Sequence, residues 1–91
     1  MPYIKQIARA DFAPVLNEIS SKITEVTTEG DMNYMITRMV LRYLETHGTN
    51  YTNINGMIGM LECTKLELYR RLAAPYENKK VDENGDVYPQ K

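Results

Sequence analysis

The stretch from Tyr51 to Glu77, YTNINGMIGMLECTKLELYRRLAAPYE, constrains the fold of this chain more than any other. Its apolar residues recur at spacings of three and four, which is the period of an α-helix that buries one face. The main stripe consists of Ile54, Met57, Ile58, Leu61, Leu68 and Leu72, and a second strip consists of Met60, Leu66 and Tyr69. The pattern predicts a long helix over residues 52–74, which Pro75 ends because it disfavours helical geometry at Ala74.

Two glycines, Gly56 and Gly59, fall inside this predicted helix and cost about 1 kcal/mol each relative to alanine. We expect the close approach of another backbone to offset that cost, with a kink or a short break near Gly59 as the alternative. A break would leave two helices in the outline of a helix-turn-helix DNA-binding protein. The sequence pI of about 5.8 and the acidic Glu62 and Glu67 disfavour binding to nucleic acid.

Two further helices precede this stretch. We expect the first over residues 11–27, with Asp11 as its N-cap and residues 1–9 as an arm or a short strand. The second is predicted over residues 31–47, with Asp31 as its N-cap and Gly48 in the left-handed position past its end. Apolar residues of this second helix extend beyond one face, which indicates that it contacts two partners.

The C-terminal segment, residues 78–91, is polar. Asn84-Gly85 is a dipeptide favoured in two-residue hairpin turns, so a short β-ribbon or a tail is predicted there. The acidic residues around Gly85 do not have the spacing of a calcium loop, because no bidentate glutamate follows at the required place. The sequence therefore predicts an all-α, three-helix domain over residues 1–91, with an N-terminal arm and a C-terminal tail or ribbon.

Composition excludes several classes of protein. A formal net charge of −1 provides no global positive field for binding nucleic acid. The single cysteine, Cys63, cannot form an internal disulfide or a cysteine-based zinc site, and no apolar run approaches the ~20 residues of a membrane span. These features predict a cytoplasmic protein that has no membrane partner.

Candidate catalytic residues are few. His47, the only histidine, lies at a predicted helix end, where an interaction with the terminal carbonyl groups is expected. Cys63 lies in mid-helix beside Glu62, and we expect it to be a small buried apolar residue, because the negative neighbour raises the pKa of a thiol. We therefore predict no catalytic residue, no metal site and no cofactor.

The best candidate for a binding site is a cluster of basic and tyrosine side chains. Its members are Arg38, Arg42, Lys65, Tyr69, Arg70, Arg71 and Tyr76. Guanidinium groups match phosphate or carboxylate, and phenols stack or donate hydrogen bonds, so the cluster suits an anion or an acidic partner. Arg38 and Arg42 extend it if the second and third helices are antiparallel. The alternative is a solvated face in which Glu62 and Glu67 form ion pairs with these cations.

Several segments resemble a small uncharacterised family of all-α proteins found in bacteria and their phages. They are GDMNYMITR (30–38), IGMLECTKLELYRR (58–71), APYE (74–77) and ENGDVY (83–88). The likeness extends over most of the chain from Met1 to Tyr88. It implies a helical, intracellular protein and brings no activity and no catalytic residue with it.

We expect a non-catalytic binding protein that self-associates. Five methionines on predicted apolar faces, Met32, Met35, Met39, Met57 and Met60, suit core packing or an interface between subunits. As a phage accessory protein directed against host defences, it would sequester an anionic, nucleotide-like ligand or block a host protein. The alternative is a protein-interaction or structural module that uses the apolar strip of the helix over residues 31–47.

Overall fold

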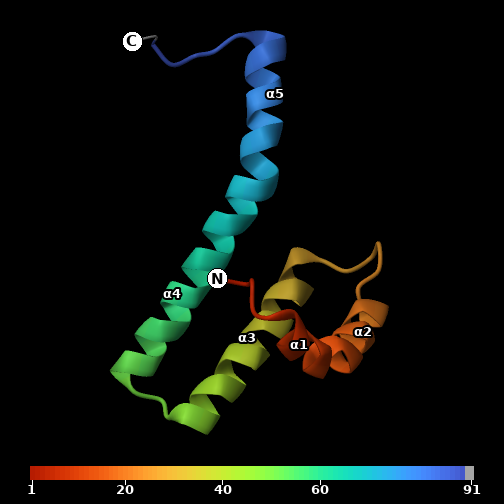
Figure 1. Ribbon diagram of the computed structural model, residues 1–91, viewed down its shortest axis with the longest axis vertical. Coiled ribbons are helices and arrows are strands. Elements are labelled where there is room, and N and C mark those ends of the chain that lie inside the picture. Colours follow the sequence, from red (N-terminus) through yellow and green to blue (C-terminus); the bar gives the residue numbers. More distant parts are fainter. Residues whose placement is uncertain (90–91) are drawn as a thin grey trace. The chain divides into compact units, whose positions relative to one another are not determined.

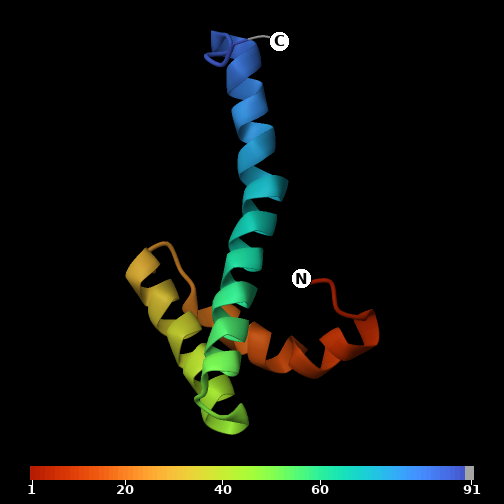
Figure 2. The same cartoon turned by 90° about the vertical axis from the view of Figure 1, so that its left-hand side faces the viewer.

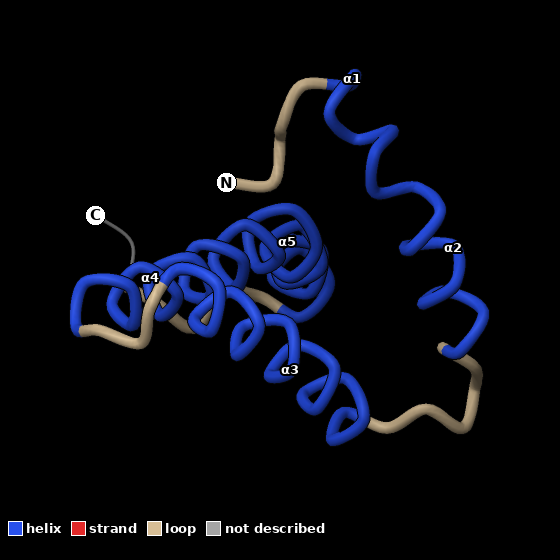
Figure 3. Tube along the Cα trace, turned by 90° about the horizontal axis from the view of Figure 1, so that it is seen from below, coloured by secondary structure: helices blue, strands red, loops and turns tan. Residues whose placement is uncertain are grey.

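The computed structural model describes residues 1–89, which form helices joined by short connections (Figure 1). In chain order they are α1 (Gln6–Arg9), the 3₁₀-helix η1 (Ala10–Phe12), α2 (Ala13–Lys22), α3 (Glu29–His47), α4 (Tyr51–Leu68), the π-helix η2 (Tyr69–Ala73) and α5 (Ala74–Asn84). The described residues contain no strand (Figure 3). The predicted all-α fold of three helical segments is confirmed, since the elements run together over residues 6–22, 29–47 and 51–84.

The chain divides into two compact units. One contains residues 2–57, and the other begins at Ile58 and also includes Met1. The boundary between them falls inside α4. The single domain predicted from the sequence stays a prediction.

The first helical segment begins earlier and ends earlier than predicted. It starts at Gln6, and Asp11 lies inside η1 without forming a side-chain cap. It ends at Lys22 because Ile23 takes an extended conformation. The Thr27 hydroxyl accepts a hydrogen bond from the Thr24 amide at 2.9 Å and donates one to the Lys22 carbonyl at 3.3 Å. The Thr27 hydroxyl thus forms hydrogen bonds with two backbone groups that would take part in helical hydrogen bonds if the helix continued.

The start of α3 differs from the prediction by three residues at the cap. Thr28, not Asp31, is the N-cap, and Asp31 occupies the third helical position. The Asp31 amide donates to the Thr28 hydroxyl at 3.1 Å, and the Thr28 amide donates to the Asp31 carboxylate at 3.0 Å. This reciprocal capping box satisfies two backbone donors, and the carboxylate lies favourably at the positive helix end.

The end of α3 and the start of α4 follow the prediction. Gly48 has a φ of +111° directly after His47, and its amide donates to the Leu44 carbonyl at 2.7 Å. Asn50 then accepts a hydrogen bond from the Asn53 amide at 2.9 Å. The Asn53 side chain donates back to the carbonyls of His47 and Gly48 at 3.2 and 2.9 Å. Two asparagines therefore close this corner by satisfying helix-terminal backbone groups.

The third helical segment is longer than predicted and is not broken. The α4 helix is unbroken through Gly56 and Gly59, so there is no helix-turn-helix break at Gly59. Figure 2 shows the chain as coiled ribbon from α4 through α5. Pro75 does not end the helix, because Ala74 keeps a right-handed helical conformation with φ −61° and ψ −47°.

The π-helix η2 explains how the chain passes Pro75. A proline in a regular α-helix removes one hydrogen bond and its ring clashes with the carbonyl four residues earlier. Here the Ala74 amide donates to the Tyr69 carbonyl, five residues back, so the turn directly before Pro75 is widened. Pro75 then lies in the first turn of α5, directly after this widened turn.

Of the two alternatives predicted for the C-terminal segment, a β-ribbon or a tail, the ribbon does not form within the described residues. Asn84 is the last residue of α5, and Gly85 caps the helix with a φ of +89°. The Asn84-Gly85 pair therefore ends a helix, and it does not form a hairpin turn. Residues 90–91 of the predicted tail lie outside the described residues.

The predicted core stripes are not buried. Leu44 of α3 is the one buried apolar residue among residues 1–89. Leu68 and Leu72, predicted to face a core, are 60% and 66% exposed. The methionines predicted to pack in a core are not buried either, and Met39 is 55% exposed. The apolar side chains of these helices are therefore largely exposed within residues 1–89.

Candidate functional site

An open groove of about 560 Å³ lies on the third helical segment. Its lining residues are Lys65, Leu68, Tyr69, Leu72, Ala73, Tyr76 and Glu77. We call this set the 65–77 groove. All seven residues belong to the unit that begins at Ile58, and all come from the consecutive elements α4, η2 and α5. The groove is therefore one face of a single helical stretch, and the chain supplies no opposite wall among these lining residues.

The spacing of the lining residues and the π-helix together create this face. Lys65, Tyr69, Ala73 and Glu77 follow one another at intervals of four. In a regular α-helix such residues drift around the axis, because one turn holds 3.6 residues. The wider turn of η2 holds more residues and so reduces the drift across the middle of the series. Four-residue spacing thus remains on one side of the helix.

A hydrogen bond between Tyr69 and Glu77 spans the groove. The Tyr69 hydroxyl donates to Glu77 Oε1 at 2.8 Å, although the two residues are eight apart in the sequence. This hydrogen bond raises the pKa of the Tyr69 phenol above its ordinary value of 10.0, and the negative charge of Glu77 raises it further. Smaller contributions come from desolvation and from Tyr88. The bond holds the Glu77 carboxylate at one end of the groove.

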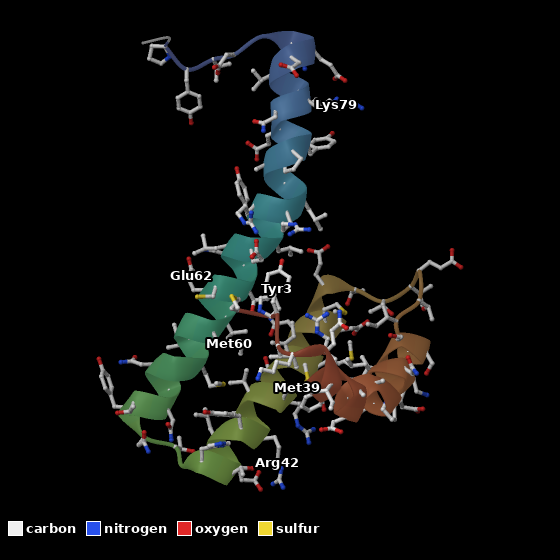
Figure 4. The ribbon with its side chains drawn as sticks, viewed as in Figure 1. Tyr3, Met39, Arg42, Met60, Glu62 and Lys79 are labelled. Atoms are coloured by element: carbon white, nitrogen blue, oxygen red, sulfur yellow. The ribbon has the colours of Figure 1, made fainter. Side chains whose placement is uncertain are left out.

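Two cations of the unit that begins at Ile58, Lys65 and Arg70, form ion pairs along the same helical stretch. Lys65 Nζ lies 2.9 Å from Glu62 Oε1, and Arg70 Nε lies 2.6 Å from Glu67 Oε1. Figure 4 labels Glu62 on α4. Both pairs join residues three apart. The Lys65–Glu62 pair is exposed and contributes little to stability, whereas the Glu67 side chain of the second pair is 22% exposed. The alternative predicted from the sequence, a solvated face with intrahelical ion pairs, describes these two cations.

Tyr76 and Arg71 complete the predicted cluster in this unit. Tyr76 lines the groove and places its ring 5.6 Å from Lys80 Nζ, within range of a cation–π contact. Arg71 lies in η2 but is not among the lining residues, and no ion pair within the described residues includes it. The groove therefore brings together three of the seven predicted residues, Lys65, Tyr69 and Tyr76.

Arg38 and Arg42 belong to the other unit, on α3. Arg38 Nη1 donates to the Tyr34 hydroxyl at 2.9 Å, and its guanidinium carbon lies 5.8 Å from the centre of the Tyr34 ring. Arg42, labelled in Figure 4, pairs with Glu45 at 2.7 Å. Both arginines are thus engaged with residues of their own helix. Their predicted part in an anion site stays a prediction.

The two candidate reactive residues have ordinary surroundings. His47 Nδ1 donates to the Tyr43 carbonyl at 3.0 Å, and the two rings stack with their centroids 3.9 Å apart. This is the helix-end role expected for His47. Cys63 is an exposed free thiol, so the prediction that it is buried is wrong. Within residues 1–89, no group of three or more histidine, cysteine or acidic side chains is arranged to hold a metal ion.

The three aliphatic groove residues lie outside the cluster predicted from the sequence. The apolar pattern predicts a core position for Leu68 and Leu72, and it does not single out Ala73. The four-residue spacing from Lys65 to Glu77 was available in the sequence as a signal. This spacing places the four residues on one side of the helix only because of the π-helix η2, and the sequence pattern does not predict that element.

The protein is therefore a small all-α protein with an open, largely apolar groove on one helix face. A family described as "Domain of unknown function (DUF6899)" matches residues 1–87. The chain belongs to this family. No curated protein and no solved structure matches the chain. None of the helices within residues 1–89 combines the length and the hydropathy needed to cross a membrane.

Proposed function

We propose that this protein is a non-catalytic binding protein that associates with another polypeptide through the 65–77 groove. The observation that carries the proposal is the unpartnered apolar face formed by α4, η2 and α5. Leu72, near the middle of the groove, is 66% exposed, and Leu68 and Tyr69 beside it are 60% and 52% exposed. Covering such side chains contributes roughly 25 cal/mol per Å² of apolar surface, which favours association.

The form of the groove favours a helix as the occupant. A groove formed by residues three and four apart on one helix complements the ridge of side chains on a second helix. The lining has leucines and an alanine at its centre and charged residues at its ends. That distribution resembles protein interfaces, which have an apolar centre and a polar rim. Blocking a host protein, as the phage resemblance suggests, would be one use of this face.

The second candidate function is the binding of an anionic small molecule. It is favoured by one observation, the absence of an ion-pair partner for Arg71 among the described residues. A free guanidinium group suits a phosphate or a carboxylate. The groove favours association more, because its central lining is apolar and its one cation, Lys65, already pairs with Glu62.

Native mass spectrometry of the gently purified full-length chain tests the proposal. The wild type is compared with Leu72→Glu, which places a charge in the groove, and with Arg71→Ala, which leaves every lining residue intact. We expect a complex of two or more polypeptide chains for the wild type and for R71A, and its loss in L72E. Circular dichroism of each variant checks that its helices remain.

Two results would contradict the proposal. One is a wild-type chain that carries no second polypeptide, and the other is a complex that L72E leaves intact. A monomer that releases an anionic small molecule on denaturation, and that no longer carries it in R71A, would favour the second candidate.

A further inference from the structure

We propose that the occupant of the 65–77 groove is the same face of a second copy of this chain, bound antiparallel about a twofold axis. This inference rests on the proposed function and names the partner. Three observations carry it: the single wall of the groove, the distribution of charge along it, and the free hydrogen-bonding capacity of its two charged ends.

The single wall requires a partner of matching shape. All lining residues belong to one helical stretch, and no residue from 58 to 89 is buried. In water an isolated helix is marginal, because most helical stability comes from packing an apolar face. A second copy of the same face supplies a second ridge of leucine and tyrosine side chains at the same spacing.

The charges at the two ends of the groove are opposite. Lys65 lies at the N-terminal end, Glu77 lies at the C-terminal end, and Leu68, Leu72 and Ala73 lie between them. In a twofold interface, residue i of one copy contacts residue j of the other, and j contacts i. An antiparallel pair therefore places Lys65 of each copy against Glu77 of the other. A parallel pair in register would place lysine against lysine and glutamate against glutamate, which is repulsive.

Both charged ends retain capacity for a second contact. Lys65 holds Glu62 at 2.9 Å with one of three ammonium hydrogens, and its side chain is 68% exposed. Glu77 accepts the Tyr69 hydrogen bond through Oε1 and keeps Oε2 for another donor. The Tyr69 bond also fixes the carboxylate at the groove end, so less side-chain freedom is lost when the second copy binds. The groove is thus self-complementary in shape and in charge.

Charge exchange at the two ends tests this arrangement. Sedimentation equilibrium of the full-length chain is measured for the wild type, K65E, E77K and the double variant K65E/E77K. In the antiparallel pair each single variant places like charges together at both ends. We expect each to weaken dimerisation roughly 10- to 30-fold, given the modest strength of exposed ion pairs. The double variant reverses both charges and is expected to return to within about threefold of the wild type.

Two controls separate this effect from folding and from net charge. K79E makes the same charge change on α5 outside the groove, and we expect it to leave the dimerisation constant unchanged. An equimolar mixture of K65E and E77K restores opposite charges at both ends and is expected to form the mixed dimer. Recovery in that mixture shows that both single variants are folded.

Each other outcome overturns the inference. If the single variants dimerise like the wild type, the interface lies elsewhere or the two copies are parallel. If the double variant dimerises as weakly as the single variants, Lys65 does not pair with Glu77 of the other copy. The wild type could instead be monomeric and bind a different polypeptide that L72E no longer binds. That result would refute the second copy as the occupant and would leave the proposed function standing. A monomer with no L72E-sensitive partner would refute both.

Discussion

Replacing Gly59 of α4 by alanine is expected to stabilise the protein by about 1 kcal/mol. Alanine is favoured over glycine in a helix interior by about that amount, because glycine loses more backbone freedom on folding. Apart from the backbone of its own helix and its chain neighbours, no atom of the described residues lies within 4 Å of the position that a Cβ would take at Gly59, so the new methyl group meets no obstacle. The same holds for Gly56, and the double variant is expected to gain up to about 2 kcal/mol. The close backbone approach predicted for these glycines does not occur within the described chain.

Thermal denaturation followed by circular dichroism measures this gain. For a chain of 91 residues, 1 kcal/mol corresponds to a rise in Tm of roughly 4–8 °C. Protein concentration is held fixed, because self-association makes Tm depend on it. Gly59 lies about 120° around the helix axis from Lys65, so G59A is expected to leave dimerisation through the groove unchanged. A fall in Tm would contradict this prediction and would show that another backbone lies close to Gly59 in solution.

Three further predictions concern local structure. Thr28→Ala removes the capping hydroxyl of α3 and is expected to lower the free energy of unfolding, measured by urea denaturation, by about 0.5–2 kcal/mol. Thr28→Ser keeps the hydroxyl and is expected to keep most of the stability. Equal losses in the two variants would contradict the role of Thr28 as the cap. Gly48→Ala is expected to destabilise the protein by about 1 kcal/mol or more, opposite in sign to G59A, because φ is +111° and the new Cβ meets Asn50 Nδ2 at 3.3 Å. The Tyr69 phenol, identified by ultraviolet titration against Y69F, is expected to titrate above pH 10, and Glu77→Gln is expected to lower its pKa. Since its folded pKa is raised, its contribution to stability is present below pH 10 and is lost as pH rises through the folded value; an unchanged pKa in E77Q would refute the assignment.

Much of the helical structure could be predicted from the sequence because local interactions decide it. The period of three and four indicated the three helical segments. The end of α3 followed from Gly48, because glycine has no Cβ and adopts a positive φ without steric cost. The asparagines at the start of α4 were expected to cap a helix, and Asn50 and Asn53 do so.

Where two local rules competed, the sequence left the outcome open. Asn84-Gly85 favours a positive φ both in a hairpin turn and at a helix end, and α5 uses it at the helix end. Pro75 disfavours a helical residue before it, yet the π-helix η2 lets Ala74 remain helical. Asp31 has the chemistry of an N-cap and of the third position in a capping box, and Thr28 takes the first role.

The candidate site could be predicted only in part, for a different reason. An apolar stripe predicts that a helix face is buried against another element, but it does not distinguish an element of the same chain from a partner molecule. The stripe predicts a core position for Leu68 and Leu72, and both are exposed on the 65–77 groove. The basic residues predict an anion site, and Lys65 and Arg70 form ion pairs along the same helical stretch. Information about a partner is present in the spacing, but the partner's identity is not.

The single cysteine allows a direct measurement of how the two copies are arranged in the dimer. Cys63 is exposed, lies outside the groove, and accepts one spin label per chain without any substitution. It lies about two helical turns from the centre of the groove, so an antiparallel pair separates the two Cys63 Cα atoms by roughly 24 Å along the axis and about 26 Å in all. Pulsed electron double resonance is predicted to give a distance near this value, broadened by the labels. A much shorter distance would indicate parallel copies, and the absence of a dipolar signal at dimerising concentrations would contradict the account.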